Sequence, residues 1–193
     1  AGGPNYVQRF LRPLTPGAAS VAFSEEPAVP MERVSVEELQ AAIDALNWHE
    51  PAPLESLVMP GPTGEANTLN LWPRGVVLCL GPTAQEAAMQ AGTARRMGCA
   101  ALMVAPGVDK DLGVNGYLER DALARLTGIS VVALWGEEAD QRAARKALAS
   151  RSGPLLPLVT QDDLDSYCLH ERHTCIDTTA AGGNASLLAT SDD

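Results

Sequence analysis

The chain has 193 residues, enough for one domain with a hydrophobic core, and 46% of them are hydrophobic, which is typical of soluble globular proteins. Its 14 Lys and Arg residues stand against 24 Asp and Glu residues, and the formal net charge of -10 argues against binding to nucleic acid. The longest apolar run, Val76–Gly81, is far shorter than the roughly 20 residues that a membrane-spanning helix needs. We therefore expect a cytoplasmic protein with no membrane span and no nucleic-acid partner.

The first 33 residues contain five prolines and little periodicity, which predicts an extended arm. The chain opens on Ala1 without an initiator Met, and either processing or a longer parent protein explains this. After the arm, Ser35 and Glu38 form a capping box, and apolar residues at helical spacing predict a helix over 36–46. Residues 51–64 are rich in Pro and Gly and predict irregular chain with strong turns.

Strands and helices then alternate. Continuous apolar runs predict buried strands over 75–80, 99–104 and 129–135. Helices are expected over 83–97, 118–126 and 137–150; the first of them has Thr83 as its cap and Glu86 at the matching capping-box position. Three such alternations indicate βαβ units, hence an α/β fold: a Rossmann-like open parallel sheet with helices on both faces.

The remainder is shorter and more polar. A strand is predicted over 155–159, a helical turn over 162–165, a polar strand over 168–176, and a tail without periodicity over 178–193. We divide the chain into an arm and short helix over 1–58, a Rossmann-like domain over 59–166, and a polar strand with its tail over 167–193.

The chemistry that such a fold often supports is missing from the sequence. A dinucleotide site places Gly-x-Gly-x-x-Gly after the first strand, so that backbone amides can approach the pyrophosphate. Here the turn has only Gly81, Pro82 removes an amide donor, and Glu86 adds negative charge. We therefore predict no cofactor-binding residues in this chain.

The sequence also gives little evidence of nucleophilic catalysis or of metal binding. Cys79 and Cys99 lie within apolar strands, where thiols are usually reduced and inert. A zinc site could be imagined from Cys168, His170, His173 and Cys175. On a strand, however, 168 and 170 face one side and 173 and 175 the other, so we predict neither a metal site nor catalytic residues.

The end of the chain is small, polar and glycine-containing, so it can run close to another backbone. Composition alone leaves two interpretations open, a frayed terminus and a docking segment. The candidate docking residues are Ile176, Asp177, Thr178, Thr179, Ala180, Ala181, Gly182, Gly183, Asn184, Ala185, Ser186 and Leu187, within a working segment that runs from Cys175 to Leu188.

Three stretches resemble one known family. Glu171 and Arg172, followed by the run from Asp177 to Leu187, resemble the C-terminal motif of the proline utilization A family of bifunctional proline-catabolic flavoenzymes. The run from Ala1 to Phe10 resembles the end of that family's aldehyde dehydrogenase module, and the stretch from Met59 to Cys79 resembles the region that follows it.

The resemblance implies that this chain is a non-catalytic domain with an aldehyde-dehydrogenase-superfamily Rossmann fold. Two catalytic modules would precede it, an FAD-dependent proline dehydrogenase and an NAD-dependent glutamate semialdehyde (1-pyrroline-5-carboxylate) dehydrogenase. Its tail would lie against the aldehyde dehydrogenase module and help to close the cavity through which the intermediate passes. The alternatives are an independent nucleotide-dependent enzyme of Rossmann type and a self-association domain of a homo-oligomer.

Overall fold

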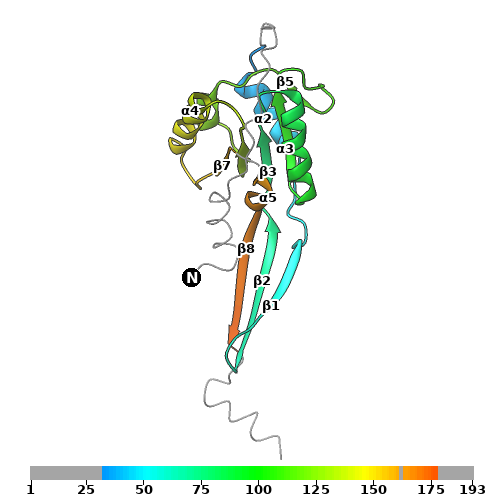
Figure 1. Ribbon diagram of the computed structural model, residues 1–193, viewed down its shortest axis with the longest axis vertical. Helices are drawn as coiled ribbons and strands as arrows, with labels where there is room; N and C mark the ends of the chain where they lie inside the picture. The colour runs from blue at the N-terminus through cyan, green and yellow to red at the C-terminus, as the bar shows by residue number, and fades with distance from the viewer. Residues whose placement is uncertain (1–31, 161–162, 178–193) are drawn as a thin grey trace, which may run out of the picture. The chain divides into compact units, whose positions relative to one another are not determined.

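The computed structural model describes residues 32–160 and 163–177 (Figure 1). All of them belong to one compact unit, Met31–Asp193. The predicted arm lies outside the described residues except for its last two positions, and the tail over 178–193 lies outside them entirely. In the described part of the chain, no helix is both long enough and apolar enough to cross a membrane.

A five-stranded parallel sheet forms the centre of the unit and confirms the predicted α/β fold. Its strand order is β5-β4-β3-β6-β7, so β3 lies in the middle and the chain winds outward from it twice. This is the order of a doubly wound sheet, with a topological switch point between β3 and β6. The strands are β3 (Val76–Cys79), β4 (Ala100–Ala105), β5 (Gly113–Asn115), β6 (Val131–Ala133) and β7 (Leu158–Val159).

Helices cover both faces of this sheet, because alternate residues of each strand enter different clusters. Leu78 and Leu80 pack in the cluster that includes the buried residues of α2 and α4, whereas Val77 and Cys79 pack in the cluster that includes those of α3 and α5. The helices are α2 (Val36–Ala45), α3 (Ala84–Arg96), α4 (Glu138–Ala149), α5 (Leu164–Tyr167) and the 3-10 turn η2 (Arg120–Ala124).

The N-cap hydrogen bonds of both predicted capping boxes are formed. The Ser35 hydroxyl accepts a hydrogen bond from the Glu38 amide at 3.1 Å, and that of Thr83 accepts one from the Glu86 amide at 3.3 Å. The Thr83 hydroxyl in turn donates to the Glu86 carboxylate at 2.9 Å. These bonds satisfy amides at the first turn that have no partner inside the helix, and so they fix where α2 and α3 begin.

In the Rossmann-like region one expected helix is wrong and one strand was missed. The helix expected over 118–126 is only the 3-10 turn η2, because Leu118, Leu123 and Leu126 are all fully buried and hold both ends of a short segment. The edge strand β5 was not predicted at all, since its three residues carry too little pattern for a strand to be recognised.

The irregular chain expected over 51–64 is also corrected. Residues Glu55–Met59 form strand β1, the regular part of the chain resumes at β2 (Glu65–Pro73), and both lie in a second sheet with β8 (Leu169–Asp177). The order of this antiparallel sheet is β1-β2-β8. The turn around Gly61–Gly64 therefore joins the two strands of a hairpin. The proposed domain limit between residues 58 and 59 falls inside β1, before its last residue.

Candidate functional site

The predicted docking residues begin on the last two positions of β8. Ile176 pairs with Ala66 and Asp177 with Glu65, which are the first residues of β2. The Ile176 side chain is 57% exposed. The other ten predicted residues, 178–187, lie outside the described residues. The structure thus locates the strand that leads into the predicted segment.

The sheet that carries β8 has two open edges within the described residues, since β1 and β8 each pair only with β2. An open edge presents unpaired backbone donors and acceptors to another chain. Every residue of β8 from Glu171 to Asp177 is exposed. Among the described strands, none pairs with the outer edge of β8.

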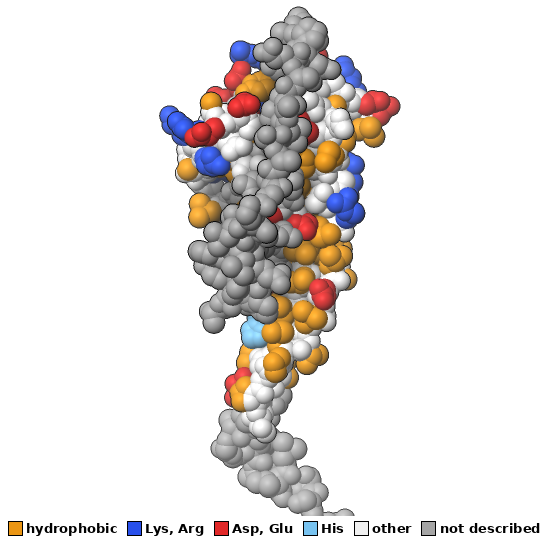
Figure 2. All heavy atoms as spheres, viewed as in Figure 1, with side chains coloured by type: hydrophobic (Ala, Val, Ile, Leu, Met, Phe, Trp, Pro, Cys, Tyr) orange, Lys and Arg blue, Asp and Glu red, His pale blue; other side chains and the backbone are white. Residues whose placement is uncertain are grey.

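One face of this sheet carries a group of leucines, with Glu55 and Glu171 paired on either side of Leu71. The register places Leu57 opposite Leu69, and Leu71 lies two residues further along the same face. Leu57 is 40% exposed, and Leu69 and Leu71 are half-buried. Figure 2 shows hydrophobic side chains over the part of the surface where Figure 1 places β1. We call Leu57, Leu69 and Leu71 the leucine face.

The opposite face carries an ion pair and an aromatic contact, together with the exposed apolar residues Val58 and Ile176. The Arg172 guanidinium lies 4.5 Å from the centre of the Trp72 ring and forms a two-pronged ion pair with the Glu50 carboxylate, one hydrogen bond of which measures 3.0 Å. The hydrogen bond from Arg172 holds the pKa of Glu50 below its usual value. Beside this cluster, partial burial and the charge of Arg172 lower the pKa of His170. The ion pair ties β8 to the chain that follows α2.

Backbone contacts join the two sheets. The Arg74 amide donates to the carbonyl of Cys168 at 2.7 Å, and its guanidinium donates to the carbonyl of Leu169 at 3.0 Å. Gly98, with φ of +75°, lies against Pro73, where an added Cβ would be only 2.8 Å from the proline ring. Only glycine combines that conformation with so close a contact. The base of the three-stranded sheet is thus fixed to the parallel sheet.

At the switch point of the parallel sheet, the protein's own groups are packed closely and paired with one another. At the end of β3, a Cβ added to Gly81 would lie 2.2 Å from the amide nitrogen of Ala87, so this glycine serves strand–helix packing. Across the switch point, Asp140 lies in the first turn of α4, which follows β6. Both of its carboxylate oxygens bind the buried guanidinium of Arg120 on η2, at 2.8 and 2.7 Å. A cation already paired in this way is not available to a phosphate.

The four Cys and His residues considered for a zinc site are spread along β8 and the position directly before it. Cys168 is buried before the strand begins, whereas Cys175 is exposed near its end. Among the described residues no three His, Cys, Asp or Glu side chains are placed to hold a metal ion. His170 and His173 lie an odd number of positions apart on β8 and therefore on opposite faces.

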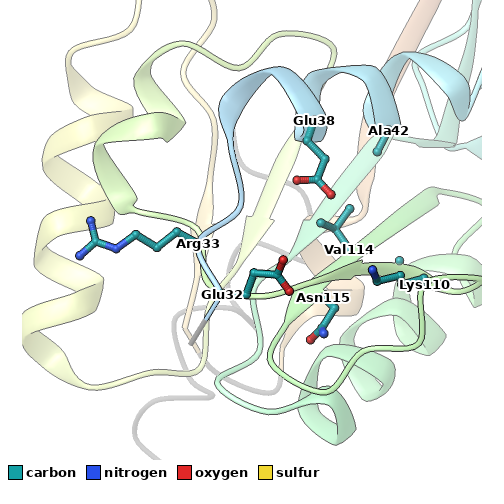
Figure 3. Close-up of a pocket in the computed structure, with 8 residues that line it drawn as sticks. Glu32, Arg33, Glu38, Ala42, Lys110, Val114 and Asn115 are labelled. Atoms are coloured by element: carbon teal, nitrogen blue, oxygen red, sulfur yellow. The ribbon is translucent and has the colours of Figure 1, made fainter. Parts of the chain in front are cut away.

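A pocket of about 280 Å³ lies between the start of α2 and β5, and Figure 3 shows it. The carboxylates of Glu32 and Glu38 and the amine of Lys110 line it, and Arg33 points away from it toward Glu119, with which it forms an ion pair at 3.2 Å. The amide oxygen of Asn115 is already bonded to the Gly107 amide. The lining contains no hydroxyl, thiol or imidazole side chain.

Sequence reasoning missed β1, β2 and the leucine face. A signal was present, since the run Thr68-Leu69-Asn70-Leu71 alternates polar and apolar residues as a half-buried strand does. The Pro and Gly residues between Met59 and Gly64 were interpreted as the limit of a domain. They equally suit the turn of a hairpin.

Comparison with known proteins supports the family resemblance. The bifunctional protein PutA of Salmonella typhimurium is 29% identical to this chain, and the match covers 97% of this chain. The bifunctional protein PutA of Escherichia coli gives the same values. Among solved structures, a Bradyrhizobium japonicum proline utilization A mutant has 25% identity and a TM-score of 0.43, over 54% of this chain and 13% of that one. No family model matches the chain.

The chain spans 16% of the length of the first two relatives. It therefore corresponds to a part of such a protein. The similarity covers both sheets, because it extends over nearly every residue of the chain. The resemblance seen in the sequence is confirmed, and the chain is a relative of proline utilization A that matches one segment of that long protein.

Proposed function

We propose that the chain is a non-catalytic domain of a PutA-like proline-catabolic oxidoreductase, and that it acts by docking. Its docking surface would be the three-stranded sheet with the segment 178–187 that follows β8. The observation that carries the proposal is that β8 is an exposed edge strand that leads directly into that segment. Strand addition at such an edge provides affinity through backbone hydrogen bonds.

The partner would be the aldehyde dehydrogenase module of the same polypeptide. That module would use NAD, and a proline dehydrogenase module would use FAD; the present chain would hold neither cofactor. The tail's small residues would allow close backbone approach, and the leucine face would bury apolar area against the partner. Docking would help to close the cavity that retains the aldehyde intermediate and to exclude water from it.

Deleting residues 178–193 from the full-length enzyme tests the proposal. We expect coupled conversion of proline to glutamate to fall, and the intermediate to appear in solution, while proline dehydrogenation alone is retained. Trapping the released aldehyde with an aromatic amine measures the leak. Unchanged coupling together with unchanged dehydrogenase activity would contradict docking by the tail.

A pair of substitutions separates the two faces of the sheet. Leu57→Asp places a charge on the leucine face, whereas Val58→Asp places it on the opposite face, where Val58 is 89% exposed. We expect the first to weaken coupling in the full-length enzyme and the second to leave it intact. Equal effects of the two would argue against the leucine face as a contact surface.

The strand order of the parallel sheet favours a second candidate, an independent nucleotide-dependent enzyme, since ligands of doubly wound folds bind at the switch point. Against it stand the tight packing of Gly81 and the pairing of Arg120 with Asp140. Calorimetric titration of the chain with NAD, NADP and ATP distinguishes the two. Saturable binding in the micromolar range would support the enzyme and overturn the proposal of a non-catalytic domain.

A further inference from the structure

Two thiols meet where the two sheets join. Cys99 lies directly before β4, and Cys168 lies between α5 and β8. The Cys99 thiol donates a hydrogen bond to the Cys168 carbonyl at 3.2 Å, and a hydrogen bond also links the two side chains. Cys99 is 5% exposed and Cys168 is fully buried. Residues 69 positions apart in sequence are thus brought together, with the Cys99 sulfur against the backbone of Cys168.

The surroundings make the two sulfurs chemically unequal. The hydrogen bond from Cys168, the backbone amides of Gly75 and Arg74, and the positive charge of Arg74 hold the pKa of Cys99 below its usual value, although burial opposes them. The same contact and burial raise the pKa of Cys168. Cys99 therefore carries the thiolate character of the pair, and Cys168 remains a thiol beside it.

The other two cysteines lack this arrangement. Burial raises the pKa of Cys79 to about 12, so its thiol stays protonated at neutral pH. Cys175 is exposed near the end of β8, and its pKa is also raised, chiefly by desolvation and by the carboxylate of Glu65. Cys79 lies in the same buried cluster as Cys99 and Cys168, but of the four cysteines only Cys99 has a lowered pKa.

We propose that Cys99 and Cys168 are a dithiol site that a peroxide oxidises to a disulfide. The Cys99 thiolate attacks one oxygen of hydrogen peroxide, the O–O bond breaks, and a sulfenic acid and hydroxide are formed. The Cys168 sulfur then displaces the sulfenic hydroxyl, which leaves as water, and the S–S bond forms. Two thiols and one peroxide yield one disulfide and two waters, so the two electrons lost by sulfur reduce the peroxide.

The bond would fasten the base of β8 to the start of β4. In the reduced protein this base is held by hydrogen bonds to the Cys168 and Leu169 carbonyls. Such bonds open and close with local fluctuations, whereas a covalent link does not. Oxidation would therefore slow local opening of β8, the strand on which the predicted docking segment begins. The site itself stands independently of the docking function.

Peptide mapping of the whole chain tests the site without any substitution, because each cysteine falls in its own tryptic peptide. The chain is treated with hydrogen peroxide in native buffer, the remaining thiols are alkylated, and the protein is digested without reductant. We expect a disulfide between peptides 97–110 and 152–172, with Cys79 and Cys175 still recovered as alkylated thiols. A link from either peptide to 173–193, or irreversible oxidation of Cys99 without a link, would overturn the proposal.

Matched variants and exchange measurements complete the test. Cys168→Ser should abolish the disulfide and leave Cys99 to oxidise further, whereas Cys175→Ser should form it at the rate of the unaltered chain. Circular dichroism confirms that each variant is folded. In the oxidised chain, amide hydrogens of β8 should exchange at least several-fold more slowly than in the reduced chain. Formation of the disulfide with unchanged exchange at β8 would refute the fastening role.

Discussion

The two sheets of the molecule differ in how far their strands are buried. All four residues of β3 are buried, and its neighbours in the parallel sheet are nearly as inaccessible, whereas β8 is exposed over seven of its nine residues. A buried strand is held by apolar contacts on both faces, and an exposed one mainly by its partner strand. Stability is therefore concentrated in the parallel sheet. The outer strands of the three-stranded sheet, β1 and β8, leave most of their residues exposed.

The largest expected effect comes from truncating the middle of the parallel sheet. Leu78→Ala removes a fully buried side chain from the core and should lower the free energy of unfolding by about 3 kcal/mol. The matched variant Val58→Ala, on β1, should change it by no more than about 0.5 kcal/mol. Urea denaturation measures both, and similar costs would break the contrast between the sheets.

A smaller effect is expected from the ion pair at the switch point. Asp140→Asn leaves the buried Arg120 guanidinium without its charged partner. Because Asp140 is a quarter exposed, we expect a loss of about 2 kcal/mol, less than for a fully buried pair. Glu138→Gln, which breaks an exposed pair with Arg142, should cost about 0.5 kcal/mol or less. Equal losses of stability in the two variants would show that burial does not strengthen the Arg120–Asp140 ion pair.

The junction of the sheets can be tested with two glycines. Gly98→Ala should cost about 1 to 2 kcal/mol, since alanine disfavours a φ of +75° and its Cβ would press on Pro73. Gly92→Ala, inside α3 with only the end of Arg96 nearby, should instead stabilise the chain by about 0.5 kcal/mol. Thermal unfolding should shift in opposite directions for the two variants.

The smallest effect concerns the clamp on β8. Because Arg172 lowers the pKa of Glu50 in the folded state, the ion pair stabilises the fold above the ordinary glutamate pKa. That contribution is lost as the pH falls through the lowered value. Glu50→Gln should therefore shift the urea midpoint slightly at pH 7 and progressively less as the pH falls through the lowered pKa of Glu50. A difference that persists in acid would assign the effect to packing of the side chain.

Prediction from sequence succeeded where local pattern and burial coincide. The strand at β3 and the caps Ser35 and Thr83 follow from apolar runs and from short-range hydrogen bonds. The hairpin of β1 and β2 was missed because its residues pack on one side only and its turn resembles a linker. The contact between Cys99 and Cys168 depends on how β8 returns to the sheet, and no local pattern encodes that.

The candidate site was only partly accessible to prediction. Of its first two residues, Ile176 was placed at the end of a polar strand predicted over 168–176, and the observed strand β8 extends one residue further, to Asp177. Its partner strand β2 begins directly after the region expected to be irregular, and the alternation of polar and apolar residues over 68–71 was not used to predict it, so the leucine face was missed. Docking by residues 178–187 remains a prediction for the experiments above.

The pairing of β2 with β8 also has a consequence for the order of events during synthesis. The strand that completes the small sheet leaves the ribosome about a hundred residues after β2, and contacts so distant in sequence form slowly. Until then, β1 and β2 form a two-stranded hairpin, which is marginal in water by itself. The surface that we expect to meet a partner is thus assembled last, after the parallel sheet on which it is mounted.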